Sequence, residues 1–407
     1  MGEGWGEGFL MSVASQTIAV FTGSRADYDL LFPLLRWLQA NNLQSKKITL
    51  VVGGEHLLRP EATLPTLKSD AQREGWQVQI LDAFLVEKST STYLPQTIGH
   101  LSACETVDWQ AVEAFIVLGD RVEAFAMALG AFYNQVPILH LAGGDLTQGG
   151  CVDDKLRWMI TELASLHACF SQTSTNRLVV RGISPQAIIH SGSLAVDNVL
   201  ATPLLTRETL LEAVGWHDVM DTRPIVLFTQ HPVGVEGVAS AHYLQQSLDA
   251  FKQANVRVIA TTPNLDANSV EANKAIQSVI AASQQEQNAD IIWFQTLGRE
   301  RYFSWLSVCD AVVGNSSSLL YEAPLFGKPA LCIGNRQQGR EHADNVHFVD
   351  YGVEAVLAGL QIVLHDEAFK TQSENAVSPF GNEPAAPKIG QFLMDYLNTA
   401  NYKAFPK

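Results

Sequence analysis

A glycine-rich segment, His140–Gly150, contains the residue with the strongest case for acid–base chemistry. It holds four glycines in eight residues, a composition that costs conformational entropy and usually lets the backbone approach a ligand closely. Asp145 lies inside this segment, and Asp153 and Asp154 follow it, ahead of Arg157. Carboxylates that converge on one cleft can push their pKa values apart, so that one serves as an acid while another stays ionised. Helix capping and dipole complementarity would account for Asp153 and Asp154, but not for Asp145.

Three further polar residues follow apolar runs that are typical of buried strands. Arg25 lies in Thr22–Tyr28, where a glycine turn feeds a helix N-terminus and offers free N–H groups to a phosphate. Asp120 follows a glycine, and it could also be the N-cap of the next helix. His231 stands before Pro232 at the tip of a predicted strand. Open α/β sheets bind ligands beyond the carboxyl ends of their strands, so we expect these side chains at the site.

The strongest single motif follows a later strand. Ser316, Ser317 and Ser318 open a predicted helix, and three consecutive hydroxyls at a helix N-terminus make a good diphosphate cradle. One serine would be enough for an ordinary N-cap. Glu322 lies about one turn further on, where a carboxylate can accept hydrogen bonds from ribose hydroxyls. This motif therefore predicts a nucleotide site.

The overall charge narrows the choice of partner. The formal net charge of the 407-residue chain is −15, and such a surface repels nucleic acid and anionic lipid. We therefore expect neither nucleic acid nor a membrane as a partner, and an anionic substrate would need local positive groups. Arg336 and Arg340, after the last predicted strand, are well placed to supply them, although exposure to solvent or to a neighbouring subunit explains them equally well.

The elements that position these residues are predicted by a repeating rhythm in the sequence, in which short apolar runs alternate with segments of helical period. This rhythm predicts βαβ units and parallel sheets, in an α/β fold. Strands are expected at Ile18–Phe21, Ile48–Val52, Val78–Phe84, Ala114–Leu118, Ile138–Leu141 and Ala187–Ile189, and then, after about Asp197, at Ile225–Phe228, Val256–Ala260, Ile291–Phe294, Ala311–Val313 and Ala330–Ile333. Two successive parallel sheets in a chain of this length indicate two Rossmann-like domains that face a cleft.

The domain assignment follows from this rhythm. Residues 16–197 are assigned to the first domain and residues 198–385 to the second, which would bind the nucleotide. Residues 1–15 are expected to form a disordered extension, with either Met1 or Met11 as the start of the chain. Residues 386–407 contain a helical pattern that we expect to pack back on the first domain.

Several classes of function and of cofactor are excluded by missing signals. The chain has no G-x-G-x-x-G and no P-loop, which argues against a dinucleotide site and against a P-loop nucleotide site. Its five cysteines are scattered, which argues against a disulfide framework or structural zinc and fits a reducing cytoplasm. No apolar run reaches the roughly 18 residues of a membrane helix. We expect a cytoplasmic protein without metal or cofactor.

Together these motifs resemble a known family, the hydrolysing UDP-N-acetylglucosamine 2-epimerases of sialic- and legionaminic-acid synthesis. That family shares the two-domain fold of the GT-B glycosyltransferases. The resemblance runs from about Ile18 to Leu397 and covers nearly the whole chain. It rests on Thr22–Tyr28, Gly119–Arg121, Gly143–Asp145 with Asp153 and Arg157, His231–Val233, Gly314–Ser318, Glu322–Pro324, Ile333–Gln337 and Gly339–Arg340.

The resemblance implies a mechanism and a role for each site residue. UDP would leave by elimination after a proton is removed from C2 of the sugar, and water would add to the resulting glycal with inversion at C2. Asp145 and Asp153 would be the acid–base carboxylates, with Asp120 and His231 supporting the diphosphate and the sugar. The diphosphate would be held by Arg25 and the three serines, and the ribose by Glu322. The resemblance also implies a homodimer or homotetramer.

The chain departs from the family pattern near these residues. Asp145 stands where many relatives have Glu, Trp158 replaces the usual His, and Glu162 stands where Lys is common. These differences leave the identity of the UDP-linked amino sugar open. Three alternatives also stay open: a non-hydrolysing 2-epimerase, a GT-B glycosyltransferase and a catalytically silent nucleotide-sugar sensor.

Overall fold

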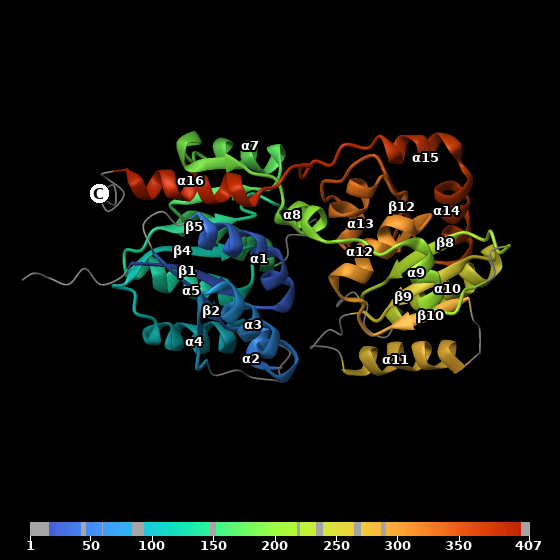
Figure 1. Cartoon of the computed structure of the whole chain (residues 1–407), viewed down its shortest axis with the longest axis horizontal. Coiled ribbons are helices and arrows are strands. Elements are labelled where there is room, and N and C mark those ends of the chain that lie inside the picture. Colours follow the sequence, from blue (N-terminus) through green and yellow to red (C-terminus); the bar gives the residue numbers. More distant parts are fainter. Residues whose placement is uncertain are drawn as a thin grey trace, which may run out of the picture.

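The structure is a computed structural model that describes residues 16–41, 46–58, 60–83, 93–146, 152–217, 220–232, 239–263, 270–285 and 290–399. The expected extension 1–15, both alternative start residues and the last eight residues of the expected C-terminal helix lie outside the described residues. Two parallel-sheet domains lie side by side in Figure 1, which confirms the predicted α/β architecture.

The first sheet has seven parallel strands in the order β3-β2-β1-β4-β5-β6-β7. The strands are β1 (Thr17–Thr22), β2 (Lys47–Val52), β3 (Gln77–Ile80), β4 (Val112–Leu118), β5 (Ile138–Leu141), β6 (Leu166–Cys169) and β7 (Ile188–His190). The helices are α1 (Arg25–Ala40), α2 (Glu55–Leu58), α3 (Pro60–Glu74), α4 (Tyr93–Ala103), α5 (Val122–Tyr133), α6 (Val152–Leu163), α7 (Gln172–Val180) and α8 (Leu194–Ala201), with 3₁₀ turns η1 (Cys104–Thr106) and η2 (Pro185–Ala187).

Alternation along β1 explains why its sheet is covered on both faces. Ile18 and Val20 belong to the buried cluster that contains the apolar face of α1, whereas Ala19 and Phe21 belong to the cluster that contains α5. Side chains that alternate across a strand can serve two helical layers only if both sets are apolar, as they are here. The sheet is therefore a rigid platform, and its carboxyl ends position the site.

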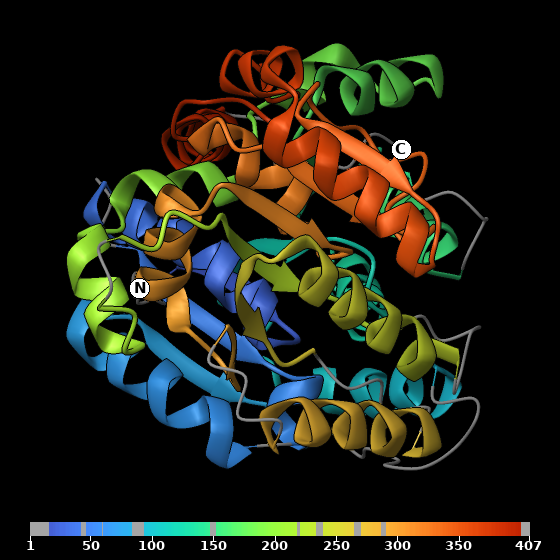
Figure 2. The same ribbon diagram turned by 90° about the vertical axis from the view of Figure 1, so that its right-hand side faces the viewer.

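The second sheet has six parallel strands in the order β10-β9-β8-β11-β12-β13. The strands are β8 (Ile225–Thr229), β9 (Arg257–Thr261), β10 (Ile291–Phe294), β11 (Ala311–Gly314), β12 (Ala330–Ile333) and β13 (Val346–Val349). The helices are α9 (Arg207–Ala213), α10 (Ala239–Ala254), α11 (Val270–Gln285), α12 (Gly298–Val308), α13 (Ser318–Tyr321), α14 (Val353–His365) and α15 (Glu367–Glu374), with the 3₁₀ turn η3 (Ala323–Phe326). Figure 2 looks onto this domain, with α10, α11 and α14 on the side turned towards the viewer.

Two strands were missed in the sequence, and one predicted strand was too long. The sequence predicted six strands in the first half and five in the second, but β6 and β13 were not recognised. Both are four-residue strands that carry a histidine, so their apolar runs are short. The expected strand Val78–Phe84 ends at Ile80, and nothing beyond Ala83 is described there.

The last helix, α16 (Ala386–Asn398), returns to the first domain and packs against α1 (Figure 1). Its entry is fixed by Asp197 in α8, whose carboxylate accepts hydrogen bonds from the main-chain N–H groups of Ala385 (2.8 Å) and Ala386 (3.0 Å). A carboxylate at a helix N-terminus satisfies N–H groups that have no partner within the helix. The chain thus crosses between the domains twice, after α8 and before α16.

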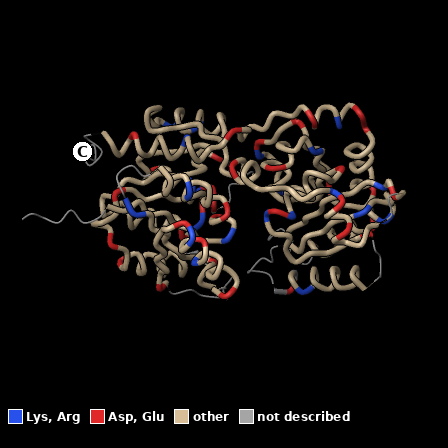
Figure 3. The backbone as a smooth tube through the Cα atoms, in the orientation of Figure 1, with Lys and Arg blue, Asp and Glu red and all other residues tan. Residues whose placement is uncertain are grey.

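Charged side chains are distributed over both domains. Along the described backbone, Lys and Arg residues are interspersed with Asp and Glu rather than gathered on one face (Figure 3). Within the same residues, no helix combines the length and the hydropathy that crossing a bilayer requires.

Candidate active site

Arg157 organises the acidic residues that the sequence singled out. Its Nη1 donates to the main-chain oxygen of Asp145 at 2.7 Å, and its Nη2 donates to the carboxylate of Asp120. The same Nη1 lies 3.6 Å from Asp154 Oδ1. The Arg157 side chain is only 10% exposed, so these charge-assisted contacts are shielded from solvent. One buried guanidinium therefore joins the ends of β4 and β5 to the first turns of α6.

Asp145 is held by its side chain as well as by its backbone. Ser174 in α7 donates its hydroxyl to Asp145 Oδ1 at 2.6 Å. Burial raises the pKa of Asp145, against the opposing effects of Arg157 and of the Ser174 hydrogen bond. A raised pKa is what a carboxyl group needs to exchange protons near neutral pH.

The glycines before Asp145 allow this approach. Gly144 has a φ of +83°, and a Cβ atom at this position would lie 2.5 Å from the carbonyl oxygen of Ser174. Any larger residue would push the loop away from α7. The entropic cost of the glycines is therefore explained by a close backbone contact, which positions the carboxylate.

Asp153 and Asp120 form the second part of the acidic group. Asp153 lies in the first turn of α6, and burial together with the nearby charge of Asp120 raises its pKa. Asp120 is not a helix cap, because the N-cap of α5 is Arg121 and no side chain caps that helix. The capping alternative for Asp120 was therefore wrong, and its carboxylate instead pairs with Arg157.

The turn after β1 contains a charge network that the sequence did not reveal. Arg121 lies 2.6 Å from Glu123 Oε1, 3.0 Å from Glu55 Oε1 and 3.9 Å from Asp27 Oδ2. Burial raises the pKa of Asp27 to about 6. Ser24 caps α1 by accepting the N–H of Asp27 at 3.2 Å.

Arg25 lies at the domain boundary, but it is exposed. Its side chain is 59% accessible and lies 3.8 Å from Asp29, which Arg299 of the second domain approaches to 3.1 Å. Among the described residues, the ion-pair partner of Arg25 is thus Asp29. A side chain with this freedom can turn towards a bound diphosphate without breaking a strong contact.

In the second domain, Asn315 fixes the position of His231. The main-chain N–H of His231 donates to Asn315 Oδ1 at 2.6 Å, and Asn315 Nδ2 donates to the carbonyl of His231 at 2.9 Å. Burial lowers the pKa of His231 to about 4, and the charge of Arg336 acts in the same direction. The imidazole is therefore neutral at physiological pH, and it can donate or accept a hydrogen bond there.

The three serines are not equivalent. Ser318 is buried, and its hydroxyl accepts a hydrogen bond from Tyr302 at 2.7 Å. Ser316 and Ser317 are half-buried and precede the short helix α13. Burial raises the pKa of Glu322 to about 7, so this carboxyl group is partly protonated near neutral pH. Two of the three hydroxyls thus remain accessible beside a carboxyl group with a perturbed pKa.

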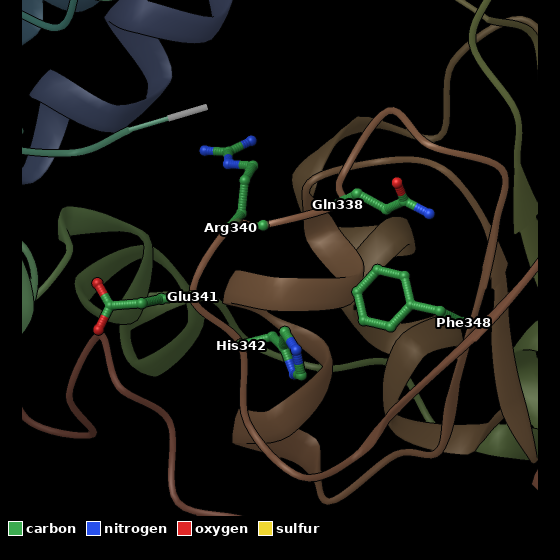
Figure 4. A pocket seen from close by; sticks show the side chains of 6 residues that line it. Gln338, Arg340, Glu341, His342 and Phe348 are labelled. Atoms are coloured by element: carbon green, nitrogen blue, oxygen red, sulfur yellow. The ribbon is translucent and has the colours of Figure 1, made fainter. Parts of the chain in front are cut away.

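The loop after β12 carries the two predicted arginines. Arg336 Nη1 donates to the carbonyl of Asn315 at 2.9 Å, and Arg340 Nη2 donates to the hydroxyl of Tyr321 at 3.1 Å. The positive charge of Arg340 lowers the pKa of Asp145, although the two residues belong to different domains. Loop residues at the carboxyl ends of both sheets therefore meet. A cavity of about 360 Å³ lies on the same loop, and Figure 4 shows five of its lining side chains, Gln338, Arg340, Glu341, His342 and Phe348.

Trp158 and Glu162 lie on another face of α6. The Arg181 guanidinium stacks 4.5 Å above the Trp158 ring, and Arg181 Nε lies 2.6 Å from Glu162 Oε1. Glu162 is 53% exposed at its side chain. These two departures from the family pattern are thus engaged with one another through Arg181, while Arg157 on the same helix faces the carboxylates.

Known proteins resemble this chain in sequence over most of its length. The family model described as UDP-N-acetylglucosamine 2-epimerase matches residues 40–394. The UDP-N,N'-diacetylbacillosamine 2-epimerase (hydrolyzing) of Legionella pneumophila is 27% identical over 87% of this chain and 90% of its own. The UDP-N-acetylglucosamine 2-epimerase of Neisseria meningitidis serogroup B is 28% identical over 84% of this chain and 86% of its own.

Solved structures share the fold. The UDP-GlcNAc 2-epimerase from Neisseria meningitidis bound to UDP-GlcNAc superposes with a TM-score of 0.74 at 17% identity, covering 93% of this chain and 100% of that one. The two proteins therefore share their overall fold over most of this chain.

Proposed function

Because this chain belongs to the UDP-N-acetylglucosamine 2-epimerase family, we propose that it is a 2-epimerase of the hydrolysing kind, which releases UDP and a free manno-configured N-acetylated sugar. The observation that carries this proposal is the acidic group around Arg157, where burial raises the pKa values of Asp145 and Asp153. Two carboxyl groups poised for proton exchange suit a reaction that removes and returns a proton at one carbon atom.

Asp145 is the proposed base. It would take the proton from C2 while the bond between C1 and the diphosphate oxygen breaks, and UDP would leave with the electron pair. The product in the site is a glycal with a double bond between C1 and C2. Water then adds its hydroxyl to C1, and a proton is delivered to the opposite face of C2, which inverts that centre. Asp153 is the proposed partner for these proton transfers, and Asp120 keeps Arg157 in place between them.

The second domain would hold the nucleotide. Ser316 and Ser317 offer accessible hydroxyls to the diphosphate, and Glu322 would accept hydrogen bonds from the ribose. Ser318 would act indirectly, since its hydroxyl already accepts a hydrogen bond from Tyr302. His231 is neutral and Arg340 is positive, so together they can stabilise charge on the departing UDP without adding a competing negative group. Arg25 and Arg336 would contribute further positive charge from either side.

The substrate is proposed to be a UDP-linked sugar with an acetamido group at C2. The hydrolysing relative in Legionella pneumophila is named for UDP-N,N'-diacetylbacillosamine, which supports a diacetamido sugar as one candidate. UDP-N-acetylglucosamine, named for the Neisseria meningitidis relative, is the other. A role in making nine-carbon acidic sugars would follow from either product. We also propose that the protein acts in the cytoplasm as a homodimer or homotetramer.

The test is proton NMR of the purified protein in deuterated water, with each candidate UDP-sugar in a separate tube. Release of UDP together with a manno-configured sugar deuterated at C2 is expected from one tube or from both. UDP that stays bonded to an epimerised sugar would replace the proposal with the non-hydrolysing reaction. Absence of reaction with UDP still bound would favour an acceptor-dependent transferase or a sensor.

A further inference from the structure

Glu341 of the second domain reaches a buried hydroxyl of the first domain. Its Oε2 accepts a hydrogen bond from Ser171 Oγ at 2.5 Å, although the two residues lie 170 positions apart. Ser171 follows β6, is fully buried and caps α7 by accepting the N–H of Ser174 at 3.1 Å. In Figure 4 the side chains of Glu341 and Arg340 leave their loop in different directions, so the two neighbours serve different contacts.

The contact continues through a second hydroxyl to the proposed base. Ser171 Oγ lies 3.0 Å from Ser174 Oγ, which in turn lies 2.6 Å from Asp145 Oδ1. Ser174 is also fully buried. Each link is short enough for a hydrogen bond, and a hydroxyl can donate and accept at the same time. When one of the two carboxyl groups carries a proton, these links form an unbroken hydrogen-bonded row from a carboxyl group of one domain to a carboxyl group of the other.

We propose that Glu341 is a positioning residue for the proton of Asp145, and that it exchanges this proton with Asp145 through the hydroxyls of Ser174 and Ser171. The inference rests on the proposed function, which assigns Asp145 as the base. Glu341 does not touch the sugar in this scheme. It acts only through the serines.

The transfer conserves atoms and charge. Protonated Asp145 gives its proton to Ser174 Oγ while Ser174 passes its own hydroxyl proton to Ser171 Oγ. Ser171 passes its hydroxyl proton to Glu341 Oε2. Asp145 then carries the negative charge again, Glu341 is neutral, and both serines are unchanged except for a rotated hydroxyl. Asp145 loses one proton, Glu341 gains one and each serine exchanges one, so neither an oxidant nor a further reactant is required.

The charges around Asp145 decide which way the proton moves. The charged and titratable side chains that influence Asp145 come from α6, from the loop after β12, from α13 and from β6; they are Arg157, Arg340, Glu341, Tyr321 and Cys169. Two positive charges favour ionised Asp145, and the charge of Glu341 opposes them. Protonating Glu341 removes that opposition, so the row returns Asp145 to its ionised form. His190 in β7 is the further titratable group that senses the charge of Glu341.

The row also links proton exchange to the arrangement of the domains. Ser171 and Ser174 belong to the first domain and Glu341 to the second, so any rotation that separates the domains breaks the row at Ser171. Protonated Asp145 could then pass its proton to Glu341 only in the closed arrangement of the domains. It would not return to its ionised form while the site is open to water.

The test compares the wild type with Glu341→Gln and Ser171→Ala, and with Asp344→Asn as a matched control. Glu341→Gln can still accept the Ser171 hydrogen bond but cannot take up a proton. Asp344 is an exposed carboxylate on the same loop, so its substitution makes the same change of charge outside the row. For each protein, kcat and KM for UDP release are measured as a function of pH. The pKa of Asp145 is measured in parallel by carbon NMR of labelled aspartate carboxyls with UDP bound, and Asp145→Asn identifies the signal.

We expect Glu341→Gln to lower kcat by about tenfold with little change in KM. This is less than the ~10²- to 10⁴-fold contribution of a direct general acid or base, because Glu341 acts through the serines. We also expect it to shift the acidic limb of the pH profile and the Asp145 signal to lower pH, since a negative neighbour is lost. Ser171→Ala should lower kcat similarly, although it leaves every charge in place. Asp344→Asn should match the wild type.

Unchanged kcat in both Glu341→Gln and Ser171→Ala would overturn the proposal. A rise in KM without a fall in kcat would also overturn it, because Glu341 would then only hold the two domains together. If the wild type released no UDP from either sugar, the proposed function would be wrong. The NMR titration of Asp145 would then be the remaining test of the proton exchange. An Asp145 titration that Glu341→Gln and Ser171→Ala both leave unchanged would then overturn the exchange.

Discussion

Arg157 and Asp120 form a buried ion pair across 37 positions of sequence, and the same guanidinium holds the backbone of the loop that carries the proposed base. Lysine has no planar fork and cannot make both contacts at once. We therefore expect Arg157→Lys to lower kcat by roughly 10²-fold through misplacement of Asp145, with UDP affinity nearly unchanged. Steady-state kinetics and UDP calorimetry check this. The control is Arg181→Lys, because Arg181 follows α7 and contacts Trp158 and Glu162 on another face of α6.

Asp145→Asn should lower turnover by about 10²- to 10⁴-fold because an amide cannot take up the C2 proton. The second domain is untouched, so UDP affinity should stay close to that of the wild type. The experiment measures UDP release and UDP binding on the same preparation. Normal turnover with weakened UDP binding would move Asp145 from the chemistry to the nucleotide site.

UDP binding should release protons from Glu322. Burial raises the pKa of this carboxyl group to about 7 in the empty site, and ribose hydroxyls that donate to it would favour the charged form and lower that pKa. Calorimetry at pH 7 in buffers of different ionisation enthalpy counts the protons released. Glu322→Gln should remove this release, and proton uptake by the wild type would contradict the assignment of Glu322 to the ribose.

The stability of the first domain should fall as the pH falls below 6.5. His140 is fully buried, donates through Nε2 to Gly119, and burial lowers its pKa to about 3. In the unfolded chain this histidine has a pKa near 6.5 and binds a proton below that pH, whereas in the folded chain it stays neutral down to about pH 3. The free energy of unfolding is therefore highest above pH 6.5 and decreases progressively as the pH falls to about 3. Between pH 6.5 and pH 5 this one residue accounts for ~2 kcal/mol.

The measurement is urea unfolding at pH 7 and pH 5. His140→Gln should reduce the difference between the two pH values by about that amount, ~2 kcal/mol, even if it lowers stability at both. Substitution of the exposed His242 should leave the difference as it is. An equal pH dependence in His140→Gln and the wild type would show that another buried group is responsible.

Gly390→Ala should destabilise the protein although alanine is the better helix former. A Cβ atom at Gly390 would lie 2.0 Å from the indole ring of Trp37. Either α16 or the ring must move, and overpacking of this kind costs roughly 1–3 kcal/mol. Thermal unfolding of Gly390→Ala checks this against Gln391→Ala, whose side chain is exposed on the same helix. An unchanged or raised melting temperature would show that the two helices have room to separate.

The sequence could predict those site residues that follow the apolar runs recognised as strands. Asp120, Asp145 and His231 were identified from the polar residues after such runs, and the structure places each of them at a strand's carboxyl end. The returning helix was predicted from a periodic apolar pattern at the end of the chain. These features depend on local patterns, which a single sequence displays directly.

Other parts of the site depend on pairings that no local pattern reveals. Ser171 and Ser174 were not identified because β6, the strand that precedes them, was not recognised in the sequence. The burial of Ser318 depends on Tyr302, which comes from a different helix. Each of these outcomes is decided by a neighbour that is distant in the chain.

The two crossings between the domains lie against each other, since Ser193 donates its main-chain N–H to Phe380 at 2.8 Å and Asp197 binds the start of α16. Two adjacent connections tie the domains together at one side only. If the domains open, the two connections place the axis of rotation through this side. Displacement grows with distance from the axis, so a small angle at Asp197 separates the remote parts of the facing loops most. Stiffness at the crossings would thus set the rate at which UDP can leave.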